Sequence, residues 1–241
     1  MTEWSKKTER RRFLCFFKNI IDDNIKHNNV DKETENGGIG IARKLRTWYP
    51  GAIYHLMERG VRRLEIFQDD FDKMIFLEIL RDELDKNGCK LHAYCLMSNH
   101  FHFLLETGEN EIGKFMKSLA CKYAMQYNHR YSFKGHVFED RYKSCLVETD
   151  DYFLQTSRYI HLNPVKAKMV AHPEDYCWSS YRGILGFCDD KVSEKDKTLR
   201  YFGEKGIWGY REFVEDIGHK YIVEEGDIKK TMGEDDLWLP W

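Results

Sequence analysis

The stretch of sequence that decides the fold reads Leu96-Met97-Ser98-Asn99-His100-Phe101-His102-Phe103-Leu104-Leu105-Glu106. Side chains alternate between the two faces of a β-strand, so a strand here places His100, His102 and Leu104 on one face. The two phenylalanines and Leu105 then occupy the other face, which suits a buried sheet surface. The histidine face carries two imidazoles about 7 Å apart along the strand. This pair could bind one metal ion or one phosphate, or could simply be hydrogen-bonded near the core.

The segments around this stretch show strand and helix patterns in a regular order. The predicted elements are a strand over residues 52–57, a helix over 71–84, a strand over 90–97, the histidine strand, a helix over 112–131 and a strand over 141–148. The order strand, helix, strand, strand, helix, strand predicts an α+β fold of the ferredoxin-like kind. In such a fold both helices cover one face of an antiparallel sheet, so the other face needs a different cover.

A further helix is predicted to provide that cover. It begins at Thr149, which offers an oxygen cap, and extends through Asn163 to Pro164. Tyr152, Tyr159 and Asn163 share one stripe of this helix, because residues three, four and seven positions apart lie on the same side. A tyrosine at a helix–sheet interface is more often a packing residue than a catalytic one. Pro164 biases the preceding residue away from helical angles, so we expect a distorted last turn.

Composition limits the class of protein. The chain has 241 residues, enough for one large domain or one domain with appendages, and no run of about 18–20 apolar residues that would cross a membrane. Its seven cysteines form an odd set without paired spacing, which argues against a disulfide framework. No secretory signal is evident at the N-terminus, and we expect a cytoplasmic protein.

The net charge of −2 conceals an uneven distribution of charge. Residues 114–146 contain seven Lys or Arg against two Asp or Glu, a net charge of +5. Residues 189–241 contain nine basic against fourteen acidic residues, a net charge of −5. A basic middle segment suggests an anionic partner, although a solvated basic face is the commoner reason for such a run. From these features we predict an N-terminal extension over residues 1–45, partly flexible, a compact domain over 46–186, and an acidic C-terminal extension over 187–241.

At this point the sequence resembles a known family. Five motifs between Thr47 and Gly186 are similar, in the right order, to those of the single-tyrosine HUH transposases, and within them to the branch associated with repetitive extragenic palindromes (REP). The motifs are Tyr49-Pro50-Gly51-Ala52-Ile53-Tyr54-His55, Ala93 to His102, Gly135 to Phe138 with Arg141 to Lys143, Arg158 to Val165, and Trp178 to Tyr181. Lys168 departs from the family pattern, which often has glycine at that position.

The resemblance implies a site and a reaction. His100 and His102 are the implied ligands of a divalent metal ion, Mg²⁺ or Mn²⁺, with Asn163 completing the site. Tyr159 is the implied nucleophile and Tyr152 the second choice. The implied reaction cleaves and transfers single-stranded DNA through a 5′-phosphotyrosine.

The resemblance also implies the partner, which is single-stranded DNA carrying a hairpin or palindrome. The basic middle segment is our hypothesis for the DNA-contacting surface, through Lys114, Lys117, Lys122, Arg130, Arg141 and Lys143. We expect a bacterial, cytoplasmic protein that is nucleoid-associated when bound to DNA, and either a monomer or a homodimer.

Two other interpretations remain open. A relative that binds hairpins but has lost catalysis would show the same motifs, although an intact set of His100, His102, Tyr159 and Asn163 favours the enzyme. A ferredoxin-like RNA-binding domain with structural histidines would instead expose base-stacking aromatics on the open sheet face.

Overall fold

The computed structural model describes residues 48–216, all of which lie in one unit of the chain, Thr47–Trp241. The first part of the fold comprises β1 (Ile53–Arg59), α2 (Asp70–Asn87), β2 (Lys90–Leu96), β3 (His100–Glu106), α3 (Ile112–Tyr131), β4 (Lys143–Val147) and α4 (Asp150–Lys166). The rest comprises the short helices η2 (Pro173–Asp175), α5 (Tyr181–Ile184), α6 (Asp196–Arg200) and η3 (Gly203–Lys205), followed by α7 (Gly206–Glu215). A 3-10 turn, η1 (Val61–Arg63), follows β1. The predictions for residues 1–45, and for the part of the C-terminal extension after residue 216, lie outside the described residues.

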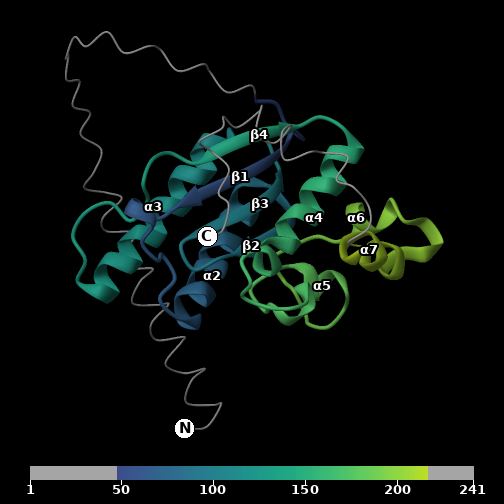
Figure 1. Ribbon diagram of the computed structural model, residues 1–241. Helices are drawn as coiled ribbons and strands as arrows, with labels where there is room; N and C mark the ends of the chain where they lie inside the picture. Colours follow the sequence, from purple (N-terminus) through teal and green to yellow (C-terminus); the bar gives the residue numbers. More distant parts are fainter. Residues whose placement is uncertain (1–47, 217–241) are drawn as a thin grey trace. The chain divides into compact units, whose positions relative to one another are not determined.

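The four strands form one antiparallel sheet in the order β2-β3-β1-β4. β3, the histidine strand, lies in the interior of the sheet between β2 and β1 (Figure 1). Because the two split β-α-β units interleave, the first and third strands are the central ones. The predicted α+β, ferredoxin-like arrangement is therefore confirmed.

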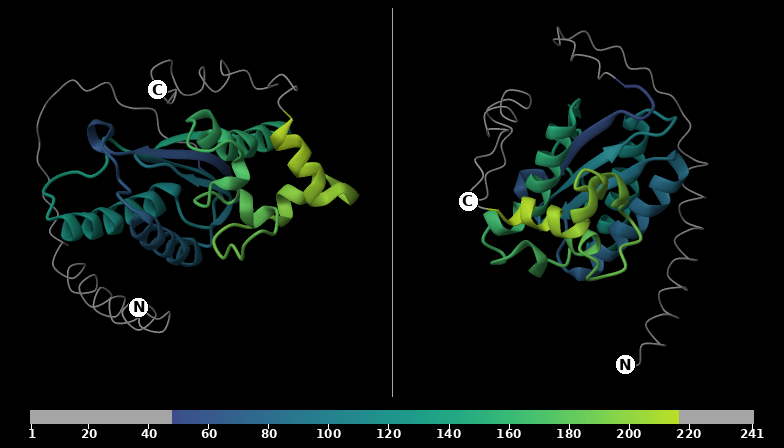
Figure 2. Two further views of the ribbon diagram at one scale, coloured as in Figure 1. Left: turned by 60° about the horizontal axis from the view of Figure 1, so that its bottom comes forward. Right: turned by 90° about the vertical axis from the view of Figure 1, so that its right-hand side faces the viewer.

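The alternation of β3 divides the core into two layers. Phe101, Phe103 and Leu105 are fully buried in a cluster that includes residues of α2 and α3, such as Phe76 and Leu119. Leu104, on the opposite face, belongs to a second cluster with α4. Figure 2 shows α2 and α3 on one side of the sheet and α4 on the other. The prediction that the tyrosine helix covers the open face is confirmed.

Local signals account for the helix ends. The side chain of Asp69 accepts a hydrogen bond from the backbone N–H of Asp72 at the start of α2, and the helix ends at Gly88 with a left-handed φ of 62°. Thr149 caps α4 in the same way through the N–H of Tyr152. These caps satisfy backbone groups that have no partner within the helix.

The expected end of α4 at Pro164 was wrong, because the helix continues to Lys166 with Pro164 inside it. Proline lacks the N–H that would donate to the carbonyl four residues earlier, and its ring crowds that carbonyl, but its fixed φ is itself compatible with a helix. Backbone hydrogen bonds from Ala167 to Asn163 and from Met169 to Pro164 close the terminus. Lys168 follows with a φ of 56°, a left-handed conformation that explains why the family pattern has glycine there.

Residues beyond 186 pack against α4 through a buried polar network. The Tyr210 hydroxyl of α7 is hydrogen-bonded to Ser157 and lies 2.7 Å from Nδ1 of His161, both on α4. Nε2 of His161 lies 2.9 Å from the hydroxyl of Ser180, which accepts from the backbone N–H of Tyr94 on β2. The network therefore joins α7, α4 and the sheet around the helix that carries Tyr159.

Replacing Tyr210 with phenylalanine should destabilise the protein by about 1–3 kcal/mol, because His161 and Ser157 would lose a buried partner. The measurement is denaturant unfolding of the full chain. Tyr201→Phe is the matched control: its hydroxyl bonds Asp150 at the surface, so its loss should change stability by no more than about 0.5 kcal/mol. Equal effects of the two substitutions would contradict the anchoring role of Tyr210.

Candidate active site

β3 brings the two histidines together with their ring centroids 5.0 Å apart. His102 is fully buried, and His100 is half-buried at the beginning of the strand. Burial lowers the pKa of His100 to about 4, with a smaller contribution from the charge of Arg59, and holds the pKa of His102 well below its usual value. Both imidazoles are therefore neutral near pH 7, which is the form that binds metal ions.

Hydrogen bonds assign the protonated ring nitrogen of His100, whereas the contact between His102 and His55 allows either ring to donate. Nδ1 of His100 lies 2.6 Å from Oδ1 of Asn99, an acceptor, so we assign the proton to Nδ1. Nδ1 of His102 lies 3.2 Å from Nε2 of His55, while Nε2 of His102 is buried without any hydrogen-bond partner. Protonation of His102 at Nδ1 leaves the lone pair on Nε2. Each histidine then presents Nε2 as a potential ligand, the arrangement usual at metal sites.

An unpartnered buried nitrogen on a neutral imidazole fits a metal ion. Within residues 48–216, however, no group of three or more His, Cys, Asp or Glu side chains is placed to hold one. Asn163, the predicted third ligand, is buried and donates from Nδ2 to the carbonyl of Tyr159 at 2.9 Å. Its Oδ1 is therefore the atom that would ligate. The ligand set of His100, His102 and Asn163 stays a prediction.

Tyr159 is the tyrosine that α4 places against the histidines. Its ring centroid lies 5.6 Å from that of His102 and 5.7 Å from that of His55, in edge-on geometry. Tyr152 lies one strand further out, with its hydroxyl 2.9 Å from the sulfur of Cys145 on β4. Of the two tyrosines, Tyr159 is thus the one whose ring packs on the histidines, and its role as nucleophile stays a prediction.

Sequence reasoning did not identify two residues that the structure brings to this site, His55 and Lys166. His55 stands in β1 opposite Leu104, and its membership of the histidine face follows from strand pairing that the sequence did not reveal. The Nζ of Lys166 lies 4.8 Å from the ring centroid of Tyr159. Lys166 is seven residues from Tyr159, a spacing that lies on the same helix stripe. A predicted helix that continued past Pro164 would therefore have included it.

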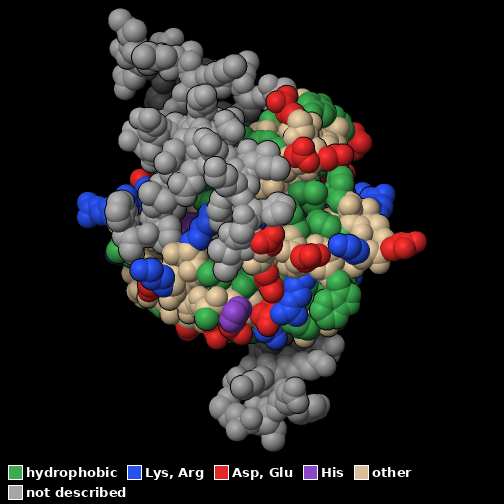
Figure 3. All heavy atoms as spheres, turned by 45° about the vertical axis from the view of Figure 1, so that its right-hand side comes forward, with side chains coloured by type: hydrophobic (Ala, Val, Ile, Leu, Met, Phe, Trp, Pro, Cys, Tyr) green, Lys and Arg blue, Asp and Glu red, His purple; other side chains and the backbone are tan. Residues whose placement is uncertain are grey.

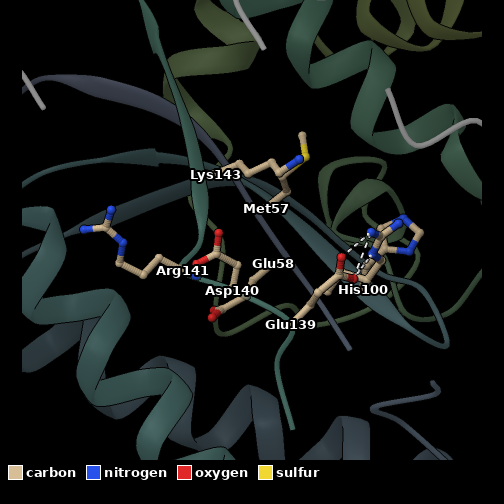
Figure 4. Close-up of a pocket in the computed structure, with 8 residues that line it drawn as sticks. Met57, Glu58, His100, Glu139, Asp140, Arg141 and Lys143 are labelled. Atoms are coloured by element: carbon tan, nitrogen blue, oxygen red, sulfur yellow. Dashed lines mark hydrogen bonds and ion pairs between the residues drawn. The ribbon is translucent and has the colours of Figure 1, made fainter. Parts of the chain in front are cut away.

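A cavity of about 130 Å³ opens beside His100 (Figure 4). It is lined by Met57, Glu58, Arg59, His100, Glu139, Asp140, Arg141 and Lys143. Arg59 and Glu139 form a bidentate ion pair across it, at 2.9 and 3.0 Å. Burial raises the pKa of Glu58 to about 8, so this carboxyl is mostly protonated at neutral pH and can donate a hydrogen bond.

The six basic residues predicted to contact DNA divide between two regions. Arg141 and Lys143 line the cavity, whereas Lys114, Lys117, Lys122 and Arg130 lie on α3, across the sheet from the histidines. Arg130 is paired with Asp69 and Asp72, and Lys122 with Glu83. On the face shown in Figure 3, basic and acidic side chains are interspersed and form no single basic field.

Comparisons with known proteins agree with this fold. Residues 49–163 match a family model described as "Transposase IS200 like". A solved structure of a REP-associated tyrosine transposase bound to a REP hairpin is similar with a TM-score of 0.52 and 13% identity, covering 64% of this chain and 93% of that chain. A candidate transposase from Deinococcus radiodurans R1 is 24% identical, covering 49% of this chain and 95% of that one, with a TM-score of 0.36. No curated protein matches the chain.

The matched segment contains β1 to β4 and most of α4, and with them His55, both histidines of β3, Tyr159 and Asn163. The solved structure with the REP hairpin shares the fold of this chain. The segment comprising residues 49–163 belongs to the IS200-like transposase family.

Proposed function

We propose that this transposase cleaves and rejoins single-stranded DNA through a 5′-phosphotyrosine formed on Tyr159. The observation that carries the proposal is the packing of the Tyr159 ring edge-on against His102, whose Nε2 is buried without a hydrogen-bond partner. A nucleophile beside nitrogens that could hold a metal ion is an arrangement that suits metal-assisted phosphodiester transfer.

The reaction needs no external energy source. The Tyr159 oxygen loses its proton and attacks the phosphorus, a new oxygen–phosphorus bond forms, and the bond to the 3′ oxygen of the preceding nucleotide breaks. That oxygen takes up a proton and leaves as a 3′-hydroxyl. The reverse attack by a 3′-hydroxyl on the phosphotyrosine rejoins the strand, because each step exchanges one phosphoester bond for another.

The proposed metal ion is Mg²⁺ or Mn²⁺, held by His100, His102 and Asn163. When bound, it would polarise the scissile phosphate and offset negative charge. Imidazole ligands also suit other transition metals, so the protein ligands alone do not select magnesium.

Two further residues support the reaction. Lys166 lies over the ring of Tyr159, where its positive charge offsets the negative charge that develops on the attacking oxygen. In the tautomer we propose, the Nδ1–H of His102 donates to Nε2 of His55, and this hydrogen bond would orient Nε2 of His102 toward the site.

The substrate we propose is single-stranded DNA that carries a hairpin. Support comes from the solved transposase of the same fold, which is bound to a REP hairpin. The alternative, a hairpin-binding relative without catalysis, predicts DNA binding but no covalent intermediate.

We expect a covalent protein–DNA band when the full chain is mixed with end-labelled, hairpin-containing single-stranded DNA from its own genomic flanks and with Mg²⁺ or Mn²⁺. The band should disappear in Tyr159→Phe, which lacks the attacking oxygen, and persist in Tyr152→Phe. The readout is a denaturing gel. Tight binding without a band in the wild-type protein would instead establish the non-catalytic alternative.

Removing His55, the hydrogen-bond partner that would orient His102, should weaken Mn²⁺ binding by about 10- to 100-fold, the usual effect of losing such a partner. His55→Leu removes the acceptor, whereas His55→Gln keeps an oxygen near the position of Nε2 and should largely restore binding. Titration calorimetry with Mn²⁺ measures this without DNA or turnover.

His92→Gln is the matched control, since this buried histidine bonds Glu106 outside the site and should leave Mn²⁺ affinity unchanged. His102→Ala should abolish both Mn²⁺ binding and cleavage while hairpin binding largely remains. Equal Mn²⁺ affinity in wild-type and His55→Leu proteins would show that His55 has only a packing role.

A further inference from the structure

The turn after β1 contains two consecutive residues in a conformation that arginine rarely adopts. Arg62 has a φ of 53° and Arg63 a φ of 61°, both in the left-handed region. Glycine, asparagine and aspartate enter this region at little cost, whereas other side chains are strained there. We refer to Gly60–Leu64 as the arginine turn. If the backbone alone mattered, smaller residues would suit these positions better.

The backbone of the arginine turn is held firmly next to the histidine strand. The N–H of Gly60 donates to the carbonyl of Asn99 at 2.8 Å, and the N–H of Val61 donates to the carbonyl of Val137 at 2.9 Å. Asn99 in turn donates from Nδ2 to the carbonyl of Arg63 at 3.3 Å, while its Oδ1 faces Nδ1 of His100. The turn is thus tied, through one side chain, to the histidine at the edge of the cavity.

The fold closes tightly on this turn. A Cβ added at Gly60 would lie 2.1 Å from the carbonyl oxygen of Leu64, so the chain doubles back on itself at that point. Strained conformations persist where the surroundings hold them, and they concentrate at functional sites. The strain here is therefore a property of a rigid, well-anchored turn.

The side chains of the turn point to solvent. Arg62 and Arg63 are exposed, and Leu64 exposes 51% of its surface. Over residues 48–216 neither guanidinium has an ion pair or a side-chain hydrogen bond, whereas Arg59 and Arg130 are paired with carboxylates. Glu65 is the nearest acidic residue in sequence, and Glu139 across the turn is already paired with Arg59.

We propose that the arginine turn binds phosphates of the single-stranded DNA where the strand approaches the cavity beside His100, an inference that rests on the proposed function. Arginine matches the geometry of phosphate oxygens with two parallel N–H donors, and an exposed Leu64 offers apolar surface to a sugar or base. Arg141 and Lys143 line the cavity itself (Figure 4), and Asn99 joins the backbone of the arginine turn to His100 at the cavity's edge.

The test compares DNA affinity with protein stability. Arg62→Asn and Arg63→Asn remove the charge but keep a residue that tolerates positive φ, so the turn should stay intact. We expect each substitution to weaken binding of a fluorescein-labelled, hairpin-containing single-stranded oligonucleotide by about five- to tenfold and to lower the slope of log affinity against log salt by about 0.7. The melting temperature of the full chain should stay equal or rise, because strain is relieved.

Arg81→Gln is the charge-matched control, since Arg81 is an exposed residue of α2, a helix that packs on the sheet face opposite the histidines. Arg62→Lys retains the charge, so its salt dependence of DNA binding should stay close to that of the wild-type protein. If the wild-type protein binds the DNA and the asparagine variants bind it as well as Arg81→Gln does, this inference alone is overturned. A lower melting temperature in those variants would assign the turn a structural role and also overturn it. Wild-type protein that binds neither hairpin nor single-stranded DNA would refute the proposed function itself.

Discussion

The alternation of one strand between two faces is the constraint on which the rest of this structure depends. β3 buries Phe101, Phe103 and Leu105 against α2 and α3, and the same strand must then turn His100 and His102 toward α4. Any shift of register by one residue would exchange the two sets, placing imidazoles in an apolar core and phenylalanines in the site. The apolar layer therefore holds the polar one in position, and the geometry of the site depends on packing that lies behind it.

Burial of the histidines costs free energy and at the same time keeps their rings neutral. Taking imidazoles out of water disfavours their charged form, which holds the pKa values of His100, His102 and His55 far below the ordinary value. Neutral rings can ligate, and the hydrogen bond between Nδ1 of His102 and Nε2 of His55 occupies one nitrogen of each ring. Among residues 48–216 the buried Nε2 of His102 has no hydrogen-bond partner, which is costly for a polar atom.

Around this centre the structure fixes the helix that carries Tyr159, the proposed nucleophile. α4 carries Tyr159 and Lys166 on one stripe, and the buried network of Tyr210, His161 and Ser157 holds that helix against the sheet. A firmly anchored helix and a firmly anchored turn near the histidines would suit the proposed transfer chemistry, in which atoms must meet within narrow limits of distance and angle.

The sequence by itself determined the order of the strands and helices from β1 to α4 and the two faces of β3, because periodicity and capping are local properties of the chain. It also identified His100, His102, Tyr159 and Asn163 as candidates, through their spacing and a family resemblance. Only the tertiary structure decided that His55 joins them, that Lys166 lies over Tyr159, and that the basic residues of α3 lie across the sheet from the histidines. These facts depend on strand register, on a helix that tolerates Pro164, and on which helix packs on which face. All three result from contacts between residues distant in sequence, which a local pattern does not encode.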